Sequence, residues 1–521
     1  MPVPATITTA IAYPNGRPHI GHAYEHIATD VLARAQRLAG RDVFFQTGTD
    51  EHGLKMAQAA RDKGISPREL ADEMAGYFRE MDDRLNISYD RFIRTSEAGH
   101  YQASQALWRA MEANGDLYLG RYEGWYSVRD EAFYGEEELT AGEDGQKLSP
   151  QGTPVEWTVE ESWFFRLSAY QDRLLALYAE RPDFIRPESR RNEVLRFVES
   201  GLTDLSVSRT SFDWGVPVPG SDGHVMYVWV DALTNYITGC GYPDDMERFS
   251  RYWAEGGDTT HIIGKDIVRF HAVYWPAFLM SAKLPLPRQI FGHGFVLNRG
   301  EKMSKSVGNV ADPLELAERF GVDQLRYFLC AEVTFGNDGS YSPEAIVLKA
   351  NSDLANSFGN LAQRTLSFIA KNLEGRLPAP APAEPDEALL AEVRRTCAEL
   401  VPAAFDDCAI SVAIEAWMRA VFACNAYIDT QAPWALRKTD PARMEAVLAT
   451  LYEAIGQLAI AISPVIPSSA EALLDQIGVP AEVRSYVALG SDWYAGLRAS
   501  GFILSPPKPL FPRLELPAVD A

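Results

Sequence analysis

The sequence has little cysteine and no motif built from it. Its 521 residues include five cysteines, which are widely spaced and form no CxxC pair. We therefore expect neither disulfides nor a cysteine-rich metal site. The chain also lacks a run of about 18 uncharged apolar residues, which predicts that no segment spans a membrane. The stretch 1–10 lacks the basic start of a secretion signal, so we expect a cytoplasmic protein.

Positive charge is also in the minority. The 49 Lys and Arg residues stand against 71 Asp and Glu, which gives a formal net charge of −22. This balance argues against a protein that coats nucleic acid non-specifically, although a local basic patch could still contact one folded RNA. The composition is otherwise that of a globular protein. A chain of this length predicts about three to four structural units.

The first 50 residues predict an α/β unit. A short apolar stretch at 6–13 predicts a strand, and apolar residues at spacings of three and four predict a helix from about Pro18 to Gly40. A second buried strand is predicted at 43–45. Strand, helix and strand in this order favour a parallel sheet with a right-handed crossover.

The amino-acid composition changes from about 115 to 220, where aromatic residues cluster between glycines and acidic turns. This predicts an inserted, mostly antiparallel module. The stretches 227–230 and 261–264 then predict strands, so the α/β sheet resumes. After about residue 353 the chain predicts a helix bundle, because two apolar stripes recur at helical spacing. The stripes are Ile410, Ile414, Trp417, Val421, Cys424 and Ile428, and Met444, Val447, Leu451, Ile455, Leu458 and Ile462.

The run His19-Ile-Gly-His22 stands where the first predicted strand gives way to the helix. A helix N-terminus offers unpaired N–H groups and the positive end of a dipole. Gly21 lets a ligand approach the backbone, and two imidazoles can donate to phosphate oxygens. The pattern therefore predicts a nucleotide-phosphate site, although two histidines in a first turn can also merely cap the helix.

The run Lys302-Met-Ser-Lys-Ser306 lies in a loop between Gly300 and Gly308. Two lysines three residues apart can reach one polyphosphate, although such a pentapeptide alone is typical of any exposed basic loop. The two motifs together, in this order, resemble the HIGH and KMSKS motifs of class I aminoacyl-tRNA synthetases.

Four further runs resemble the methionyl-tRNA synthetase family over essentially the whole chain. They are 11–22, 47–53, 229–232, and Gly264-Lys-Asp-Ile267 followed by Phe270-His271. The leucyl, isoleucyl and valyl enzymes share both motifs but carry far larger editing insertions. The resemblance implies a Rossmann-like parallel sheet with an inserted connective domain, followed by an all-α anticodon-binding helix bundle. The implied regions are 1–114 (catalytic, first half), 115–225 (connective), 226–300 (catalytic, second half), 301–352 (KMSKS and stem contact) and 353–521 (anticodon-binding domain and tail).

The family's reaction joins methionine and ATP to methionyl-adenylate and then transfers methionine to the 3′ end of initiator and elongator tRNA. The resemblance implies Mg²⁺ with the ATP and a monomeric enzyme. Its implied catalytic residues are His19, His22, Lys302 and Lys305. The implied ATP-binding residues are Asn15, Gly21, Glu25, Gly264, Asp266 and Val296.

For methionine, Asp50 would take the ammonium group. The implied side-chain pocket is Ala10, Ile11, Tyr13, Trp229, Ala232, Leu233, Tyr236, Ile267 and His271, and aromatic rings suit a thioether. Asn360, Arg364 and Trp434 match residues that read the anticodon, where polar groups and a stacking ring recognise loop bases. Taken singly, these residues are equally typical of surface and core positions.

Many methionyl enzymes carry a zinc knuckle in the inserted domain. The matching positions here hold Ser127, Asp130, Leu148 and Gln151, and no cysteine or histidine lies between His100 and His224. Structural zinc prefers thiolate or imidazole, so we expect no zinc, and we expect packing of the aromatic residues to hold the insert together.

Two other functions compete with this interpretation. Small-molecule nucleotidyltransferases share an HxGH helix, but they are short and lack a C-terminal helix bundle. A non-catalytic tRNA-binding paralogue would be expected to lose His22 or Lys305, and both are present.

Overall fold

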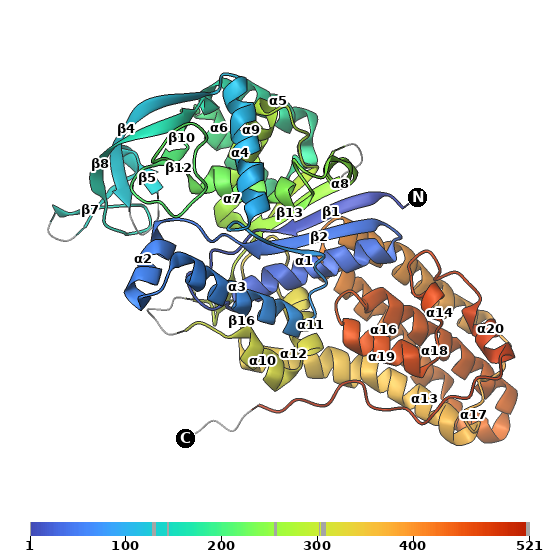
Figure 1. Ribbon diagram of the computed structural model, residues 1–521. Helices are drawn as coiled ribbons and strands as arrows, with labels where there is room; N and C mark the ends of the chain where they lie inside the picture. Colours follow the sequence, from blue (N-terminus) through green and yellow to red (C-terminus); the bar gives the residue numbers. More distant parts are fainter. Residues whose placement is uncertain are drawn as a thin grey trace, which may run out of the picture.

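A six-stranded parallel sheet forms the centre of the molecule (Figure 1). The structure is a computed structural model that describes residues 2–127, 132–142, 145–254, 258–301, 303 and 309–516. The strand order is β3 (Arg91–Arg94), β2 (Asp42–Thr49), β1 (Pro4–Thr9), β13 (Asp258–Gly264), β14 (Gln289–His293) and β9 (Ile185–Arg186). From β1 the chain winds outward through β2 to β3. On the other side of β1 it forms β13 and then β14, and β9, which comes earlier in the sequence, lies at that edge. Such a sheet has a switch point between its two central strands, where ligands usually bind at the carboxyl ends.

The predicted strand–helix–strand unit is confirmed, with shifted ends. The helix α1 (Ile20–Leu38) begins two residues after Pro18, with His19 as its N-cap, and Gly40 follows it at a φ of 82°. The second strand, β2, is longer than the predicted 43–45. The strand at 261–264 is also confirmed as the end of β13.

Helices cover both faces of the sheet. Because side chains alternate along a strand, Ile262 packs with α1 whereas Ile263 packs on the opposite face. The α1 face also carries α3 (Pro67–Arg84), and the opposite face carries α4 (Ala98–Ala113), α7 (Val228–Gly239), α8 (Met246–Tyr252) and α9 (Trp275–Ser281). The helix α2 (Leu54–Lys63) packs on α3.

The strand predicted at 227–230 is wrong. Tyr227 is the extended N-cap of α7, and residues 228–230 form the first turn of that helix, just after the short strand β12 (Val225–Met226). A four-residue apolar run has no period that separates a strand from a buried helix. Here both faces of the helix are covered, and every residue from 230 to 237 is buried, the polar ones included.

The insert contains the expected antiparallel sheet together with helices. Its sheet has the order β10 (Leu205–Ser206), β8 (Glu156–Phe165), β4 (Leu117–Ser127) and β5 (Ala132–Tyr134). The helices α5 (Gln171–Glu180) and α6 (Glu188–Glu199) flank β9, which joins the edge of the central sheet. The insert is therefore tied to the catalytic sheet by a strand, and its boundaries at 115 and 225 stay predictions. Its two small ribbons pair β6 (Thr140–Ala141) with β7 (Lys147–Leu148) and β11 (Ser208–Arg209) with β12.

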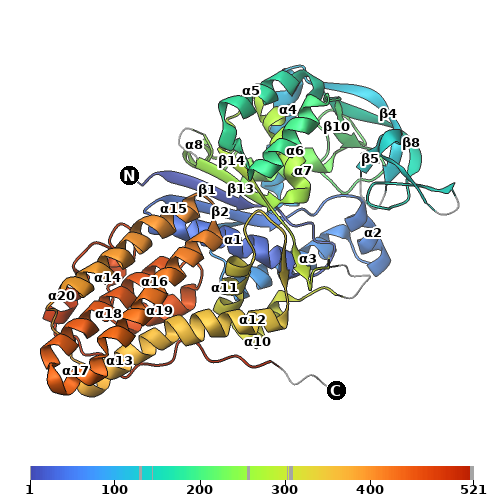
Figure 2. The ribbon, with the colours of Figure 1, turned by 180° about the vertical axis from the view of Figure 1, so that it is seen from behind.

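The C-terminal bundle is confirmed, and both predicted apolar stripes are buried in it. The bundle lies below the sheet in the view of Figure 2. By length and composition alone, α18 could cross a membrane, but 89% of its apolar window is buried in the protein, as in a core helix. Its helices are α13 (Asn360–Asn372), α14 (Glu384–Arg395), α15 (Val401–Asp406), α16 (Ile410–Gln431), α17 (Pro433–Thr439), α18 (Pro441–Ile462), α19 (Pro467–Gln476) and α20 (Trp493–Ala499).

One long helical run leads into this bundle. The helix α12 (Pro343–Lys349) continues through a π-helical segment (Ala350–Gly359) into α13, and the residues at both junctions keep helical backbone angles. Before it, α10 (Pro313–Phe320) and α11 (Val322–Glu332) lie beside α1 and α3, and β15 (Val296–Asn298) pairs with β16 (Gly339–Tyr341).

A buried arginine connects the sheet region to the bundle. Arg326 of α11 is fully buried and donates to Asp30 of α1 at 2.6 Å. It also donates to the carbonyl oxygens of Pro464 at 2.9 Å and Val465 at 3.0 Å, in the turn between α18 and α19. One side chain thus bridges three segments that are far apart in the sequence.

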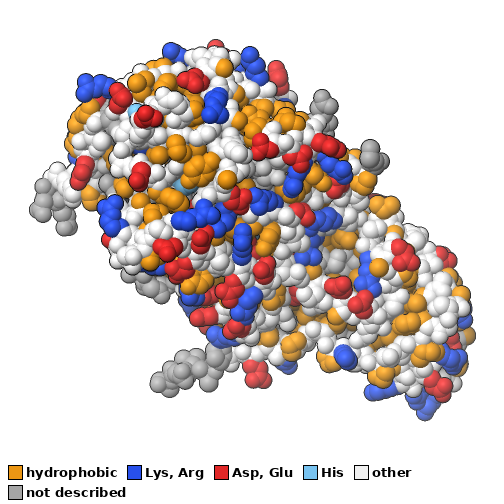
Figure 3. All heavy atoms as spheres, viewed as in Figure 1, with side chains coloured by type: hydrophobic (Ala, Val, Ile, Leu, Met, Phe, Trp, Pro, Cys, Tyr) orange, Lys and Arg blue, Asp and Glu red, His pale blue; other side chains and the backbone are white. Residues whose placement is uncertain are grey.

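The surface carries both signs of charge, interspersed over the face seen in Figure 3. The five cysteines are buried and free.

Candidate active site

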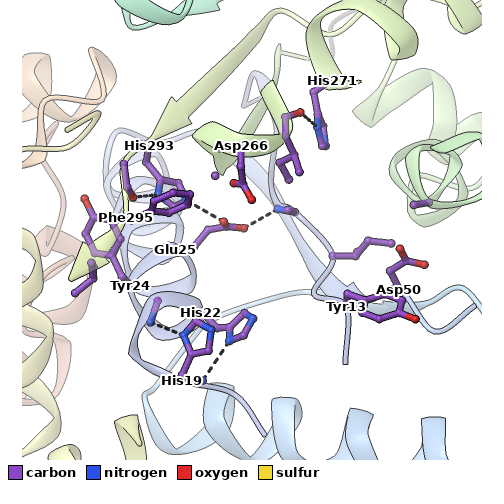
Figure 4. A pocket seen from close by; sticks show the side chains of 18 of the residues that line it. Tyr13, His19, His22, Tyr24, Glu25, Asp50, Asp266, His271, His293 and Phe295 are labelled. Atoms are coloured by element: carbon purple, nitrogen blue, oxygen red, sulfur yellow. Dashed lines mark hydrogen bonds and ion pairs between the residues drawn. The ribbon is translucent and has the colours of Figure 1, made fainter. Parts of the chain in front are cut away.

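A cavity of about 430 Å³ opens at the switch point of the sheet (Figure 4). Its walls are the segments that leave β1, β13 and β14, together with the start of α1 and the side of α7. The cavity brings together residues from positions 10 to 303 of the chain.

Nearly every described residue that the resemblance assigns to ATP or methionine lines this cavity. Asn15 is the exception, because it is exposed in the turn after Tyr13 and is not part of the lining. Lys302 and Lys305 fall outside the described residues. The roles of all these residues stay predictions. Those in the lining are His19, Gly21, His22, Glu25, Gly264, Asp266 and Val296, and Ala10, Ile11, Tyr13, Asp50, Trp229, Ala232, Leu233, Tyr236, Ile267 and His271.

The two histidines of the first motif cap α1 and also face the cavity. Nδ1 of His19 accepts the backbone N–H of Gly21 at 3.0 Å, and Nδ1 of His22 accepts that of His19 at 3.2 Å. A Cβ on Gly21 would lie 2.8 Å from Cε1 of His19, so only glycine fits beneath the ring. Capping and a ligand site are therefore compatible, because the cap fixes both rings at the cavity edge.

Aromatic groups form the wall next to α7. Trp229 stacks on Phe270 with ring centroids 3.5 Å apart. His271 donates from Nδ1 to the carbonyl oxygen of Ile267 at 2.9 Å, and its Nε2 accepts the hydroxyl of Tyr236 at 2.7 Å. Burial lowers the pKa of His271 to about 4, so this ring is neutral at pH 7. The wall is thus uncharged and suited to an apolar side chain.

Asp50 lies in the loop that leaves β2 and is 7% exposed. The next two residues anchor this loop, since Glu51 accepts from Arg94 at 2.7 Å and His52 contacts Asp231 of α7 at 2.6 Å. Burial alone would raise the pKa of Asp231, but His52 and His100 outweigh it and lower the pKa to about 2. A buried carboxylate therefore joins the Asp50 loop to the helix that carries the aromatic wall.

Sequence reasoning missed six lining residues: Tyr24, Asn235, His293, Gly294, Phe295 and Met303. For His293 a signal was available, because it stands one residue beyond the apolar stretch 290–291 and ends a buried strand, as Gly264 does. Nothing comparable marks Tyr24, which has the spacing of an ordinary core residue of α1.

The three residues predicted to read an anticodon belong to α13 and α17, whose labels lie side by side at the end of the bundle remote from the sheet in Figure 2. The guanidinium of Arg364 pairs with Asp429 at 2.7 Å and lies 5.3 Å from the ring centroid of Trp434. Trp434 is 46% exposed, and Asn360 is exposed one turn before Arg364. An exposed ring beside a guanidinium and an amide offers stacking and hydrogen bonding to an unpaired base.

The insert holds a group of hydroxyls where the family's zinc knuckle would lie. Thr153 shares hydrogen bonds with Ser127 at 2.7 Å and with Ser149 at 2.8 Å, and all three side chains are buried. Packing is therefore supplemented by polar contacts, which the sequence did not predict. Leu148 pairs with Thr140 in the β6–β7 ribbon, and Asp130 lies outside the described residues. In the described part of the chain, no three His, Cys, Asp or Glu side chains are placed to hold a metal ion.

We expect the purified protein, without a histidine tag, to contain no stoichiometric zinc. A strong zinc chelator should leave its activity unchanged when Mg²⁺ is in excess, because hydroxyls and a leucine at the knuckle are poor zinc ligands. Elemental analysis of the protein, never refolded, is the measurement. A content close to one zinc per chain would contradict the prediction.

A switch-point cavity edged by an HIGH helix start, followed by a helix bundle, defines a class I aminoacyl-tRNA synthetase. The family model described as tRNA synthetases class I (M) matches residues 5–366, and the anticodon binding domain of methionyl tRNA ligase matches 378–515. The chain belongs to the methionyl-tRNA synthetase family.

Relatives and solved structures agree with this assignment. The methionine–tRNA ligase of Brucella suis biovar 1 is 61% identical over 508 residues, which cover 97% of each chain. That of Mycobacterium tuberculosis H37Rv is 56% identical over 522 residues, covering 99% of this chain and 98% of the relative. The structure of Mycobacterium tuberculosis methionyl-tRNA synthetase in complex with methionyl-adenylate matches with a TM-score of 0.93 at 56% identity. It covers 98% of this chain and 100% of that one.

Proposed function

We propose that this cavity binds methionine and ATP side by side and joins them as methionyl-adenylate and pyrophosphate. The chain is a methionine–tRNA ligase, and it charges tRNA with methionine. The observation that supports the site is that one cavity gathers residues of both predicted groups, with Asp50 and the aromatic wall on one side and α1 on the other.

Methionine-dependent ATP–pyrophosphate exchange tests this function, followed by charging of initiator and elongator tRNA. Absence of exchange with methionine, while another amino acid supports it, would overturn the proposed substrate. Exchange without charging would leave the cavity chemistry intact and contradict the role of the bundle.

The reaction needs no nucleophile from the protein. The methionine carboxylate attacks the α-phosphorus, a P–O bond forms, and the bond to the pyrophosphate oxygen breaks, so the pyrophosphate carries away the charge. We propose that His19 and His22 donate to phosphate oxygens from the start of α1, where the helix dipole is also favourable. Catalysis then consists of positioning the substrates and stabilising the charge that develops.

Magnesium enters in this proposal as part of the ATP substrate. The carboxylates of the cavity lining are Glu25, Asp50 and Asp266. Asp50 is proposed to take the ammonium group of methionine, and both Glu25 oxygens already accept hydrogen bonds, from Ala10 and His293. This set is too small for a protein cage. It fits an ion held mainly by phosphate oxygens and water, as is usual for Mg²⁺.

Lys305→Ala should lower the rate of adenylate formation by about 10²- to 10³-fold and leave methionine binding near normal. The lysine is proposed to meet charge that grows on the leaving pyrophosphate, whereas methionine lies at the α7 wall. Rapid-quench measurement of the chemical step checks this expectation, with Lys302→Ala as the companion variant. An unchanged chemical step would rule out the role.

Trp434→Ala should weaken tRNA charging and spare ATP–pyrophosphate exchange. An exposed ring loses its stacking contact with a base, worth about 1–3 kcal/mol, so kcat/KM for tRNA should fall by about 5- to 150-fold. Phe422→Ala is a matched control, because Phe422 is also an exposed aromatic of the bundle. Equal losses in both assays would mean that Trp434 acts through the structure instead.

We also propose that the protein acts as a monomer in the cytoplasm. One chain carries both the cavity and the Asn360, Arg364 and Trp434 surface, so neither needs a second copy. Five free, buried cysteines fit a reducing compartment. Light scattering of the purified protein tests the oligomeric state.

A further inference from the structure

His293 lies at the end of β14 and has an acceptor at each ring nitrogen. Its Nε2 is 2.8 Å from Oε2 of Glu25, and its Nδ1 is 2.8 Å from the carbonyl oxygen of Gly294. A carbonyl oxygen and an ionised carboxylate both accept hydrogen bonds and cannot donate them. Glu25 is held as an acceptor at its other oxygen too, by the backbone N–H of Ala10 at 2.8 Å. Both nitrogens of His293 therefore donate, which requires a doubly protonated ring.

The two acceptors belong to different walls of the cavity. Glu25 projects from α1, whereas Gly294 begins the segment that leads through Phe295 to Val296 (Figure 4). The backbone of this segment is closely packed, because a Cβ on Gly294 would lie 2.2 Å from the carbonyl carbon of Asn337. The backbone N–H of Phe295 also donates to Asp338 at 2.8 Å. His293 is thus a cross-link between two walls on the α1 side of the cavity.

We propose that His293 is a positioning residue for ATP, which acts as a buried imidazolium that fixes the Glu25 carboxylate and the Gly294–Val296 segment at a set separation. The proposal rests on the placement of ATP on the α1 side of the cavity, argued above. Loss of the proton forces one nitrogen to present a lone pair to an oxygen. Either the bond to Glu25 or the bond to Gly294 is then lost, and the two walls are no longer held together.

The surroundings favour the protonated ring. Burial alone would lower the pKa of His293, but the hydrogen bond and charge of Glu25 outweigh it, with help from Asp266, so the pKa is raised. The other titratable group against the ring is Tyr24, which meets it edge to face with ring centroids 5.4 Å apart, and Phe335 stacks on it with centroids 6.0 Å apart. A raised pKa means that the cross-link is complete at low pH and is lost as the pH rises through that pKa.

The test is the KM for ATP in ATP–pyrophosphate exchange, at saturating methionine, from about pH 6 to about pH 9. This range extends above the ordinary histidine range of about pH 5–8 because the pKa of His293 is raised. In the wild type we expect KM to rise by about 10-fold or more with pH, since a hydrogen bond to a charged group is worth about 1.5–3 kcal/mol. In His293→Gln the amide can still donate to Glu25 but cannot titrate, so the pH-dependent rise should disappear. His19 and His22 are present in both proteins, so their titration cancels in the comparison.

His224→Gln is the matched control. His224 is also buried and bonds to Ser208 at 3.0 Å, but it lies in the insert and does not line the cavity. This variant should keep the wild-type pH profile. Identical profiles for the wild type and His293→Gln would overturn the proposal and leave the proposed function standing. Absence of exchange at every pH in the wild type would overturn the proposed function instead.

A second measurement needs neither activity nor a folded variant. In wild-type protein labelled with ¹³C at histidine Cε1, an imidazolium resonance that keeps its proton above the ordinary histidine range should move when ATP is added. His26, whose pKa is also raised because its pair with Asp82 at 2.6 Å outweighs burial, does not line the cavity, so its resonance should stay in place. If every histidine resonance of the folded protein is neutral at pH 7, His293 is not an imidazolium and the proposal is wrong.

Discussion

Asp50→Asn should raise the KM for methionine far more than it changes the KM for ATP. The substitution keeps the shape of a nearly buried side chain and removes its charge. Removing one partner of a buried charge pair costs about 2–5 kcal/mol, which corresponds to about 30- to 5,000-fold in KM. The ammonium group of methionine would be left in the cavity without its counter-charge, whereas the phosphates are proposed to lie at α1. Steady-state exchange kinetics with each substrate varied in turn give both constants.

Asp116→Asn is the control for this experiment. Asp116 is also buried, and its carboxylate accepts from Tyr170 at 2.5 Å and from Ser281 at 2.6 Å, but it is not part of the cavity lining. That variant should lose stability and keep the wild-type KM for methionine. Parallel increases of both KM values in Asp50→Asn would mean that the loop has moved and that Asp50 is a structural residue.

Arg326→Ala should lower the stability of the whole chain. It leaves Asp30 and the carbonyl oxygens of Pro464 and Val465 buried without this donor. Breaking a buried ion pair from one side costs about 3–5 kcal/mol, so the melting temperature of a chain of this length should fall by about 3–5 °C. Arg84→Ala is the comparison, because Arg84 pairs with Glu318 on the surface, where such a pair is worth about 0–1 kcal/mol.

Differential scanning calorimetry shows whether the Arg326→Ala substitution destabilises one part of the chain or the whole of it. Because Arg326 joins α1 to the turn between α18 and α19, its loss should separate the unfolding of the bundle from that of the sheet. A single transition at the wild-type temperature would contradict the bridging role.

The Arg326–Asp30 ion pair also determines how the free energy of unfolding changes with pH. Burial would raise the pKa of Asp30, but Arg326 and Arg34 outweigh it and lower the pKa, so this contribution is lost only in acid.

Much of the site could be predicted because its residues sit in local patterns. His19 and His22 stand at a predicted helix start, whereas Asp50 and Gly264 were assigned because they lie in runs that resemble the family. His293 also ends a buried strand but belongs to none of the matched runs, and its contact with Glu25, which is 268 positions away in the chain, forms only on folding. The helix start at 228 was mistaken for a strand because burial on all sides removes the period that separates the two. The Ser127, Ser149 and Thr153 contacts likewise depend on folding of the insert, and hydroxyls leave no spacing signal.

The helical run from Pro343 to Asn372 fixes both the distance between its ends and the directions in which its side chains point around the helix axis. It spans roughly 40 Å at about 1.5 Å per residue, and each residue turns the helix by about 100°. Deleting a single residue upstream of Arg364 would therefore rotate its guanidinium away from Trp434 while shortening the span by little more than an ångström. We expect this segment to tolerate substitution well and insertion or deletion poorly, since a change in the number of residues misaligns Arg364 with Trp434.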